Sequence, residues 1–115
     1  MAPARPDRTL PLDRAEALER IGGDEAFLDE LLALYDEEYA AKSAAITSAL
    51  EAGDLDQVRS LGHGLKGASA NLSLPGLREA AQAIETAGRE KNGPAAGTAL
   101  QRLEEEYKAL KAFLG

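Results

Sequence analysis

Apolar residues recur at alternating intervals of three and four along most of this sequence, and this spacing constrains the fold more than any other feature. Such a period, close to 3.6 residues, is that of an α-helix with one buried face. It is clearest in the third apolar stretch, at Val58, Leu61, Leu65, Ala68 and Leu72. No segment alternates with the period of two that indicates a β-strand. The sequence therefore predicts an all-α protein.

Capping residues, glycines and prolines divide the chain into five expected helices. Asp13 and Asp54 each precede a Glu or Gln by three residues, the spacing of a capping box. Prolines at 75 and 94 suit the first turns of later helices. We expect helices to begin near residues 13, 24, 54, 75 and 94. The breaks between them are expected at glycines 22, 23, 53 and 88 and at residues 91–94.

The near-heptad spacing favours helices that cross at about 20°, as they do in most four-helix bundles. Short loops between consecutive helices imply antiparallel neighbours. The expected fold is an up-down antiparallel four-helix bundle with a short additional N-terminal helix. A chain of 115 residues is long enough to bury a core without metals or disulfides, and it contains no cysteine.

Charge and terminal composition narrow the classes of partner. The net charge of −7 argues against a nucleic-acid or membrane binder, which would need a basic face. Residues 1–11 hold three prolines and no apolar signal segment, and we predict a disordered tail or linker end there, followed by one domain over 12–115. No run approaches the ~18 apolar residues of a membrane span, so we expect a cytoplasmic domain. We also expect the domain to be a monomer.

The only histidine, His63, stands in the third helix among three glycines. At 100° per residue it lies opposite the apolar stripe, so we expect it to face water. A core histidine fits this position badly, and a surface histidine without a role is the other alternative. Arg59, Lys66, Gly67 and Ala70 are expected on the same face as the histidine.

Glycines 62, 64 and 67 weaken a helix interior, by about 1 kcal/mol each. We interpret them as removing side chains around the imidazole, so that the surface of a second protein can approach a nucleophile. Gly64 and Gly67, with Arg59 and Ala70, form the predicted partner-binding face.

The surroundings of His63 exclude several kinds of site. One histidine cannot hold a catalytic metal, and the glycines lack the strand and spacing of a phosphate-binding loop. A Ser–His–acid arrangement needs a carboxylate against the ring, and we expect none nearby. What remains is nucleophilic attack by the imidazole on phosphorus, with Lys66 offsetting negative charge.

The stretch HGLKGASANL resembles the signature of histidine-containing phosphotransfer (HPt) domains. The segments LDRAEALERIGGDEAFLDELLALYDEE and LREAAQAIETAG are similar to other helices of that family, so the resemblance covers about 100 residues. It implies that His63 accepts the phosphoryl group, that Lys66 stabilises it, and that Gly67 admits the partner. Ser73 departs from the pattern, because the family usually has glycine there.

The function implied by the resemblance is a phosphorelay intermediate that carries a phosphoryl group between receiver-domain aspartates and is not itself an enzyme. The expected partners are receiver domains of a hybrid histidine kinase or a response regulator. These would supply Mg²⁺, and we expect no cofactor in this chain. The alternatives are a non-phosphorylated helical adaptor and the phosphoacceptor domain of a chemotaxis-type histidine kinase. Arg78 could join the basic spot or lie on a solvated face.

Overall fold

The computed structural model describes residues 10–115, and its regular secondary structure in that range is entirely helical. The elements are α1 (Arg14–Arg20), α2 (Glu25–Glu51), α3 (Leu55–Asn71), α4 (Pro75–Arg89) and α5 (Gly93–Leu114). The predicted all-α bundle with a short N-terminal helix is confirmed. Residues 1–9 of the predicted tail lie outside the described residues.

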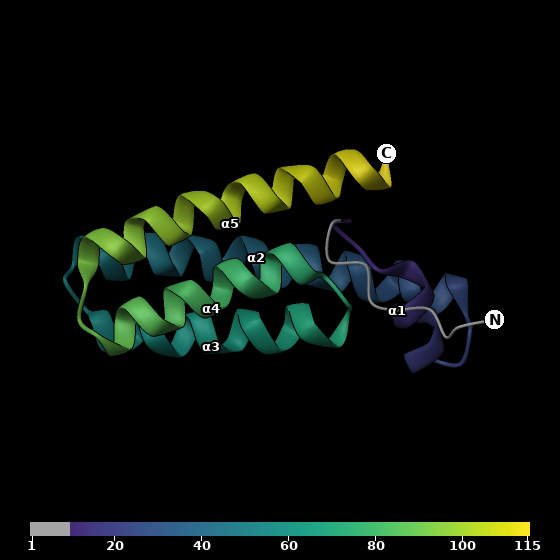
Figure 1. Ribbon diagram of the computed structural model, residues 1–115, viewed down its shortest axis with the longest axis horizontal. Coiled ribbons are helices and arrows are strands. Elements are labelled where there is room, and N and C mark those ends of the chain that lie inside the picture. Colours follow the sequence, from purple (N-terminus) through teal and green to yellow (C-terminus); the bar gives the residue numbers. More distant parts are fainter. Residues whose placement is uncertain (1–9) are drawn as a thin grey trace.

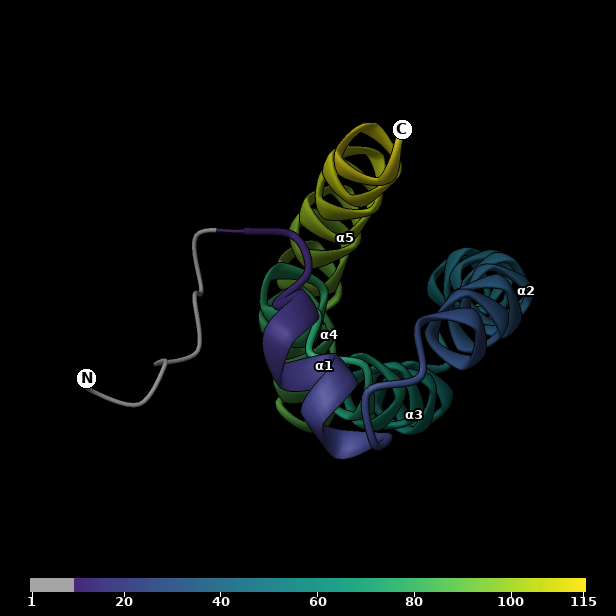
Figure 2. The same cartoon turned by 90° about the vertical axis from the view of Figure 1, so that its right-hand side faces the viewer.

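The four long helices run antiparallel to their neighbours in sequence (Figure 1). A view along the bundle shows α3 and α4 side by side, with α2 next to α3 and α5 next to α4 (Figure 2). Helix α1 lies across the end of the bundle, near the turn between α3 and α4.

Side-chain caps begin most of the helices where the sequence predicts them. The carboxylates of Asp13, Asp24 and Asp54 each accept a hydrogen bond from the backbone N–H three residues later. Asn92 does the same for α5, so that helix begins at Gly93 rather than at Pro94. Each cap satisfies one of the N–H groups that a helix start leaves unpaired.

Helices α3 and α4 approach each other closely because both carry a glycine in their contact. A Cβ at Gly62 would lie 2.7 Å from the backbone nitrogen of Glu85, and a Cβ at Gly88 would lie 2.6 Å from that of Arg59. The prediction that Gly88 marks a loop is wrong, because it lies inside α4 and is buried. Its role is to let the two backbones meet.

The buried face of α3 differs by a small rotation from the predicted stripe. Its buried residues are Val58, Gly62, Leu65 and Ser69, with Leu72 at the C-cap. Leu61, predicted to be buried, is only partly so, since its neighbour Gly62 is the residue that packs directly against the backbone of α4. Inside the core the hydroxyl groups of Tyr35 and Ser69 share a hydrogen bond of 2.9 Å. Burial raises the pKa of Tyr35 to about 12, so its hydroxyl stays protonated at neutral pH.

Helices α2 and α5 meet through a polar and aromatic cluster. The rings of Tyr39 and Tyr107 stack with centroids 3.7 Å apart. The Tyr107 hydroxyl donates to Asp36 at 2.6 Å, and the Lys111 ammonium donates to the other oxygen of the same carboxylate at 2.8 Å. This cluster ties the two outer helices of the bundle together.

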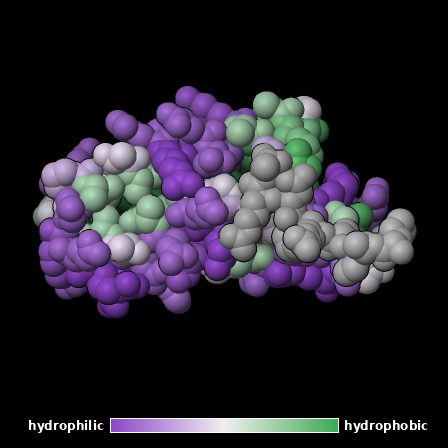
Figure 3. All heavy atoms as spheres, viewed as in Figure 1, coloured by the Kyte–Doolittle hydropathy of each residue, from purple (hydrophilic) through white to green (hydrophobic). Residues whose placement is uncertain are grey.

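The surface is mostly hydrophilic on the side shown in Figure 3, with hydrophobic residues gathered near the C-terminal end of α5. Phe113 and Leu114 are exposed there. On α2, the large apolar residues Phe27 and Leu34 are 43% and 59% exposed. None of the helices described is long and apolar enough to span a bilayer.

Candidate functional site

His63 lies near the middle of α3, and 69% of its side chain is exposed, as predicted. Its neighbour Leu65 is fully buried, so the helix presents the histidine outward while its opposite face enters the core. The imidazole is therefore open to a second molecule.

A carboxylate from the neighbouring helix contacts this imidazole. Oε2 of Glu85, on α4, lies 2.8 Å from Nδ1 of His63. The Glu85 side chain is only 9% exposed, and its backbone is the part of α4 that Gly62 contacts. The close approach of α3 and α4 thus places a buried carboxylate against the exposed ring.

Lys66 binds the second oxygen of the same carboxylate. Its ammonium donates to Oε1 of Glu85 at 2.6 Å, and the Lys66 side chain is 27% exposed. Arg89, one turn after Glu85 on α4, brings a further guanidinium to 3.8 Å from Oε2. The hydrogen bond from Lys66, helped by that from His63, lowers the pKa of Glu85 even though burial opposes ionisation. Glu85 is therefore a carboxylate at neutral pH.

The ionised carboxylate fixes the tautomer of a neutral His63. A carboxylate can only accept hydrogen bonds, so Nδ1 of the ring must carry the hydrogen and donate it. The lone pair of the neutral ring then lies on Nε2, at the edge away from Glu85. This geometry leaves Nε2 as the ring nitrogen with a lone pair available to a second molecule.

The expectation that no carboxylate stands against the ring is wrong. Glu85 is 22 residues from His63 in sequence and on another helix, so the sequence around His63 does not reveal it. One signal was available in the sequence. Glu85 directly follows Ile84 and stands four residues after Ala81, so it lies beside the apolar stripe of α4, where an acidic residue needs a partner.

The three glycines around His63 have different surroundings. Gly62 is buried against α4, so the interpretation that it clears space for a partner is wrong for this residue. Gly64 lies beside the aliphatic chain of Lys42, whose Cε would be 3.1 Å from an added Cβ. Only Gly67 has nothing within 4 Å of the position of a Cβ. The open space lies one turn after His63, beside Lys66.

A groove runs from this open space to the N-terminal half of α2. Gly64 and Gly67 line it on α3, and Phe27, Leu31 and Leu34 line it on α2. Arg20 and Ile21, at the end of α1, close it on a third side. The exposed apolar residues of α2 therefore border the same surface as the histidine.

The other predicted partner-binding residues are dispersed. Arg59 is exposed one turn before His63, with its backbone against Gly88. Ala70 is half-buried, and its carbonyl accepts a hydrogen bond from Arg20. Arg78 is exposed on α4. The cation that α4 brings to the site is instead Arg89, which is not among the predicted residues.

Among residues 10–115, no group of three or more His, Asp or Glu side chains is arranged to hold a metal ion. The chemistry that these residues offer is that of one exposed imidazole, one buried carboxylate and two cations.

Comparison with known proteins agrees with this arrangement. A model of the Hpt domain family matches residues 26–113, which include α3 and α4 and all but one residue of α2 and of α5. A search of curated protein sequences found no match. The match covers well over half of the chain and contains the exposed histidine, its lysine and its carboxylate. The chain belongs to the Hpt domain family, the histidine phosphotransfer modules of phosphorelays.

Proposed function

We propose that this domain is an intermediate of a multistep phosphorelay in the cytoplasm, where it carries a phosphoryl group on His63 between the aspartates of two receiver domains. The observation that supports this most directly is the pairing of an exposed imidazole with a buried carboxylate at its Nδ1. That pairing directs one nitrogen inward and leaves the other for chemistry.

In the proposed transfer, the Nε2 lone pair attacks the phosphorus of an aspartyl phosphate. A P–N bond forms, the P–O bond to the aspartate breaks, and the receiver's carboxylate leaves with the electron pair. The ring gains positive charge as the bond forms, and Glu85 offsets it through the Nδ1–H hydrogen bond. Transfer to the next receiver is the same step in reverse.

Lys66 is the proposed partner of the phosphoryl oxygens. An ammonium has three donors, and Glu85 accepts from one of them, so the remaining hydrogens can face the transferring group. We infer that the Mg²⁺ needed for transfer comes with the receiver. The domain itself then acts as a carrier rather than as an enzyme.

We infer that the receiver docks over the groove beside Gly67. The groove is bordered by the exposed apolar side chains of Phe27 and Leu34, which a partner would cover, and it begins within one turn of His63. Arg20 lines the groove and Lys66 directly precedes Gly67, which also lines it, while the acidic lining residue Glu38 is paired with Lys42. The two cations suit the acidic pocket around a phosphorylated aspartate.

The first test is labelling of the domain by a phosphorylated receiver. We expect one phosphoryl group per chain, stable in alkali and lost in acid, as a phosphoramidate behaves. His63→Gln should abolish the label, because glutamine supplies no nucleophilic nitrogen. Equal thermal melting of the two proteins would show that folding is intact. Label that persists in the variant would place the nucleophile elsewhere.

The second test concerns clearance at the docking surface. Gly67→Arg should abolish transfer because it fills the open space beside Lys66. Gly97→Arg is the matched control, since Gly97 lies in α5 and also has nothing within 4 Å of an added Cβ. Both variants should be as stable as the wild type or more so, by several tenths of a kcal/mol, because arginine favours a helix more than glycine does. Normal transfer by Gly67→Arg would rule out this docking site.

A further inference from the structure

Helix α1 precedes the residues that match the family, which begin at residue 26, yet it forms one wall of the groove. It has seven residues, and within the helix only Ala17 is buried. Leu12, just before it, is fully buried and anchors its start. So short a helix with so little buried surface needs further contacts to hold its position.

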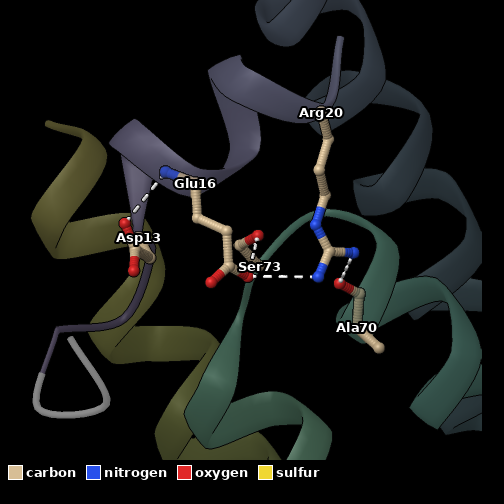
Figure 4. Close-up of polar contacts among 5 residues, drawn as sticks. All are labelled: Asp13, Glu16, Arg20, Ala70 and Ser73. Carbon is tan, nitrogen blue, oxygen red and sulfur yellow. Dashed lines mark hydrogen bonds and ion pairs between the residues drawn. The ribbon is translucent and has the colours of Figure 1, made fainter. Parts of the chain in front are cut away.

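Those contacts are polar, and they converge on the turn between α3 and α4 (Figure 4). The Ser73 hydroxyl donates to Oε1 of Glu16 at 2.8 Å, and Nη2 of Arg20 donates to the same oxygen at 3.2 Å. We call Glu16, Arg20 and Ser73 the α1 latch. Next to it, the backbone N–H of Asp13 donates to the carbonyl of Ser73 at 2.9 Å.

The latch also reaches the helix that carries the site. Nη1 of Arg20 donates to the carbonyl of Ala70 at 3.0 Å, in the last turn of α3. That carbonyl also accepts a hydrogen bond from the backbone N–H of Ser73 at 3.1 Å, and the cation of Arg20 suits the negative end of the helix. The last turn of α3 contains no basic residue of its own, so Arg20 supplies one from α1.

Ser73 has a backbone conformation that suits glycine better. Its φ is +57°, in the left-handed region that a side chain disfavours. Its hydroxyl is buried in the contact with Glu16, so the serine gains an interaction that glycine could not make. The hydrogen bond to Glu16 of α1 therefore offsets part of the cost of the unfavourable backbone conformation at Ser73.

We propose that the α1 latch fixes α1 as a wall of the docking groove and thereby sets how tightly a receiver binds, without taking part in phosphoryl transfer. Glu16 and Ser73 are positioning residues, because their hydrogen bond joins α1 to the turn between α3 and α4 and does not involve the imidazole. The held helix presents Arg20, which is about half exposed, at the rim of the groove. The matching partner is a receiver surface with an apolar patch bordered by a carboxylate. The proposal rests on the proposed function.

The test uses two substitutions by glycine, each at a turn residue with the same positive φ. Ser73→Gly removes the hydroxyl and relieves the backbone. Lys91→Gly relieves the same backbone conformation, φ +57°, at the turn between α4 and α5, away from the latch. With the receiver domain that transfers fastest to the wild type, Ser73→Gly should raise the receiver concentration for half-maximal rate about fivefold, as expected from one lost hydrogen bond. The maximal rate should not change, and Lys91→Gly should behave like the wild type.

A second measurement needs no receiver. Amide hydrogen exchange in residues 14–20 should become faster in Ser73→Gly while exchange in α4 stays the same. Glu16→Ala should also weaken receiver binding and speed amide exchange in α1, without changing the backbone at residue 73. Glu16→Gln should show smaller changes of both kinds, because its amide oxygen can still accept a hydrogen bond from Ser73.

The outcomes separate the two proposals. Failure of the wild-type domain to accept a phosphoryl group from any receiver would contradict the proposed function, whereas the exchange result would still report on the latch. Unchanged α1 exchange in Ser73→Gly would overturn the latch proposal. So would a half-maximal receiver concentration for Ser73→Gly equal to that of a wild type that does transfer.

Discussion

Glu85 and Asp36 each accept one hydrogen bond from a lysine and one from a ring-bearing side chain, but the two clusters differ in what they hold. Glu85 is 9% exposed and binds an imidazole that is 69% exposed, whereas Asp36 is 36% exposed and binds a partly buried tyrosine. Hydrogen bonds from lysine lower the pKa of both carboxyl groups. The Asp36 cluster joins α2 to α5, and the Glu85 cluster orients the imidazole that we propose as the nucleophile. On that proposal, the same donor pattern serves structure in one place and chemistry in the other.

The largest effect should come from removing the lysine of the Glu85 cluster. Lys66→Ala should slow phosphoryl transfer in both directions by about 100-fold, because one donor to a transferring group has that order of effect. Lys111→Ala, the same change in the Asp36 cluster, should leave the rate unaltered. Single-turnover rates at saturating receiver measure both. Equal losses in the two variants would mean that Lys66 acts only through stability.

Changing the carboxylate itself should have a smaller effect on the rate. Glu85→Ala should slow transfer about tenfold, because His63 loses the acceptor that fixes its tautomer and offsets its charge. Glu85→Gln should lose less, since an amide oxygen can still accept from Nδ1. Glu79→Gln on the exposed side of α4 is the control. A rate for Glu85→Ala equal to that of the wild type would contradict the role proposed for this residue.

In the other cluster the effect should be on stability alone. Asp36→Asn should lower the free energy of unfolding by about 1 kcal/mol, a modest figure because the carboxylate is partly exposed and water screens its pair with Lys111. Denaturant unfolding measures the change, and transfer to and from a receiver should stay normal. A slower transfer would show that the two clusters are coupled through the bundle.

The smallest effect should appear in how the free energy of unfolding changes with pH under acid conditions. The folded pKa values of Glu85 and Asp36 lie below their ordinary values of 4.5 and 3.8. Each carboxylate therefore contributes stability that is present above the ordinary pKa and lost as the pH falls through the folded one. Glu85→Gln and Asp36→Asn should each flatten the decline of unfolding free energy below about pH 4.5. A decline as steep as that of the wild type would assign acid unfolding to other groups.

The sequence was sufficient to predict features that depend on neighbours along one helix. Helical period predicted the bundle and the exposure of His63, and capping residues predicted the starts at Asp13, Asp24 and Asp54. Such features need only the 3.6-residue repeat and local hydrogen bonds.

Features that depend on how two helices meet were not predicted. Glu85 reaches His63 only because Gly62 lets α4 come close, and nothing within either helix specifies that pairing. For the same reason, the sequence pattern alone does not predict that Gly88 lies inside α4 or that Leu61 is only partly buried. Contacts across a bundle depend on the rotation of each helix about its axis, which periodicity gives only to within a residue.

The rotation of α3 about its axis is fixed in part by the buried hydrogen bond between Tyr35 and Ser69. A slip of α3 by one residue would turn it by about 100° and separate the two buried hydroxyls. Each unpaired group would cost about 1–3 kcal/mol, a penalty that a purely apolar contact would not impose. A slipped α3 would also turn His63 away from Glu85. The hydrogen bond between the two buried hydroxyls therefore disfavours a misrotated α3. In this way an interaction inside the core keeps the surface histidine in the orientation that its proposed chemistry needs.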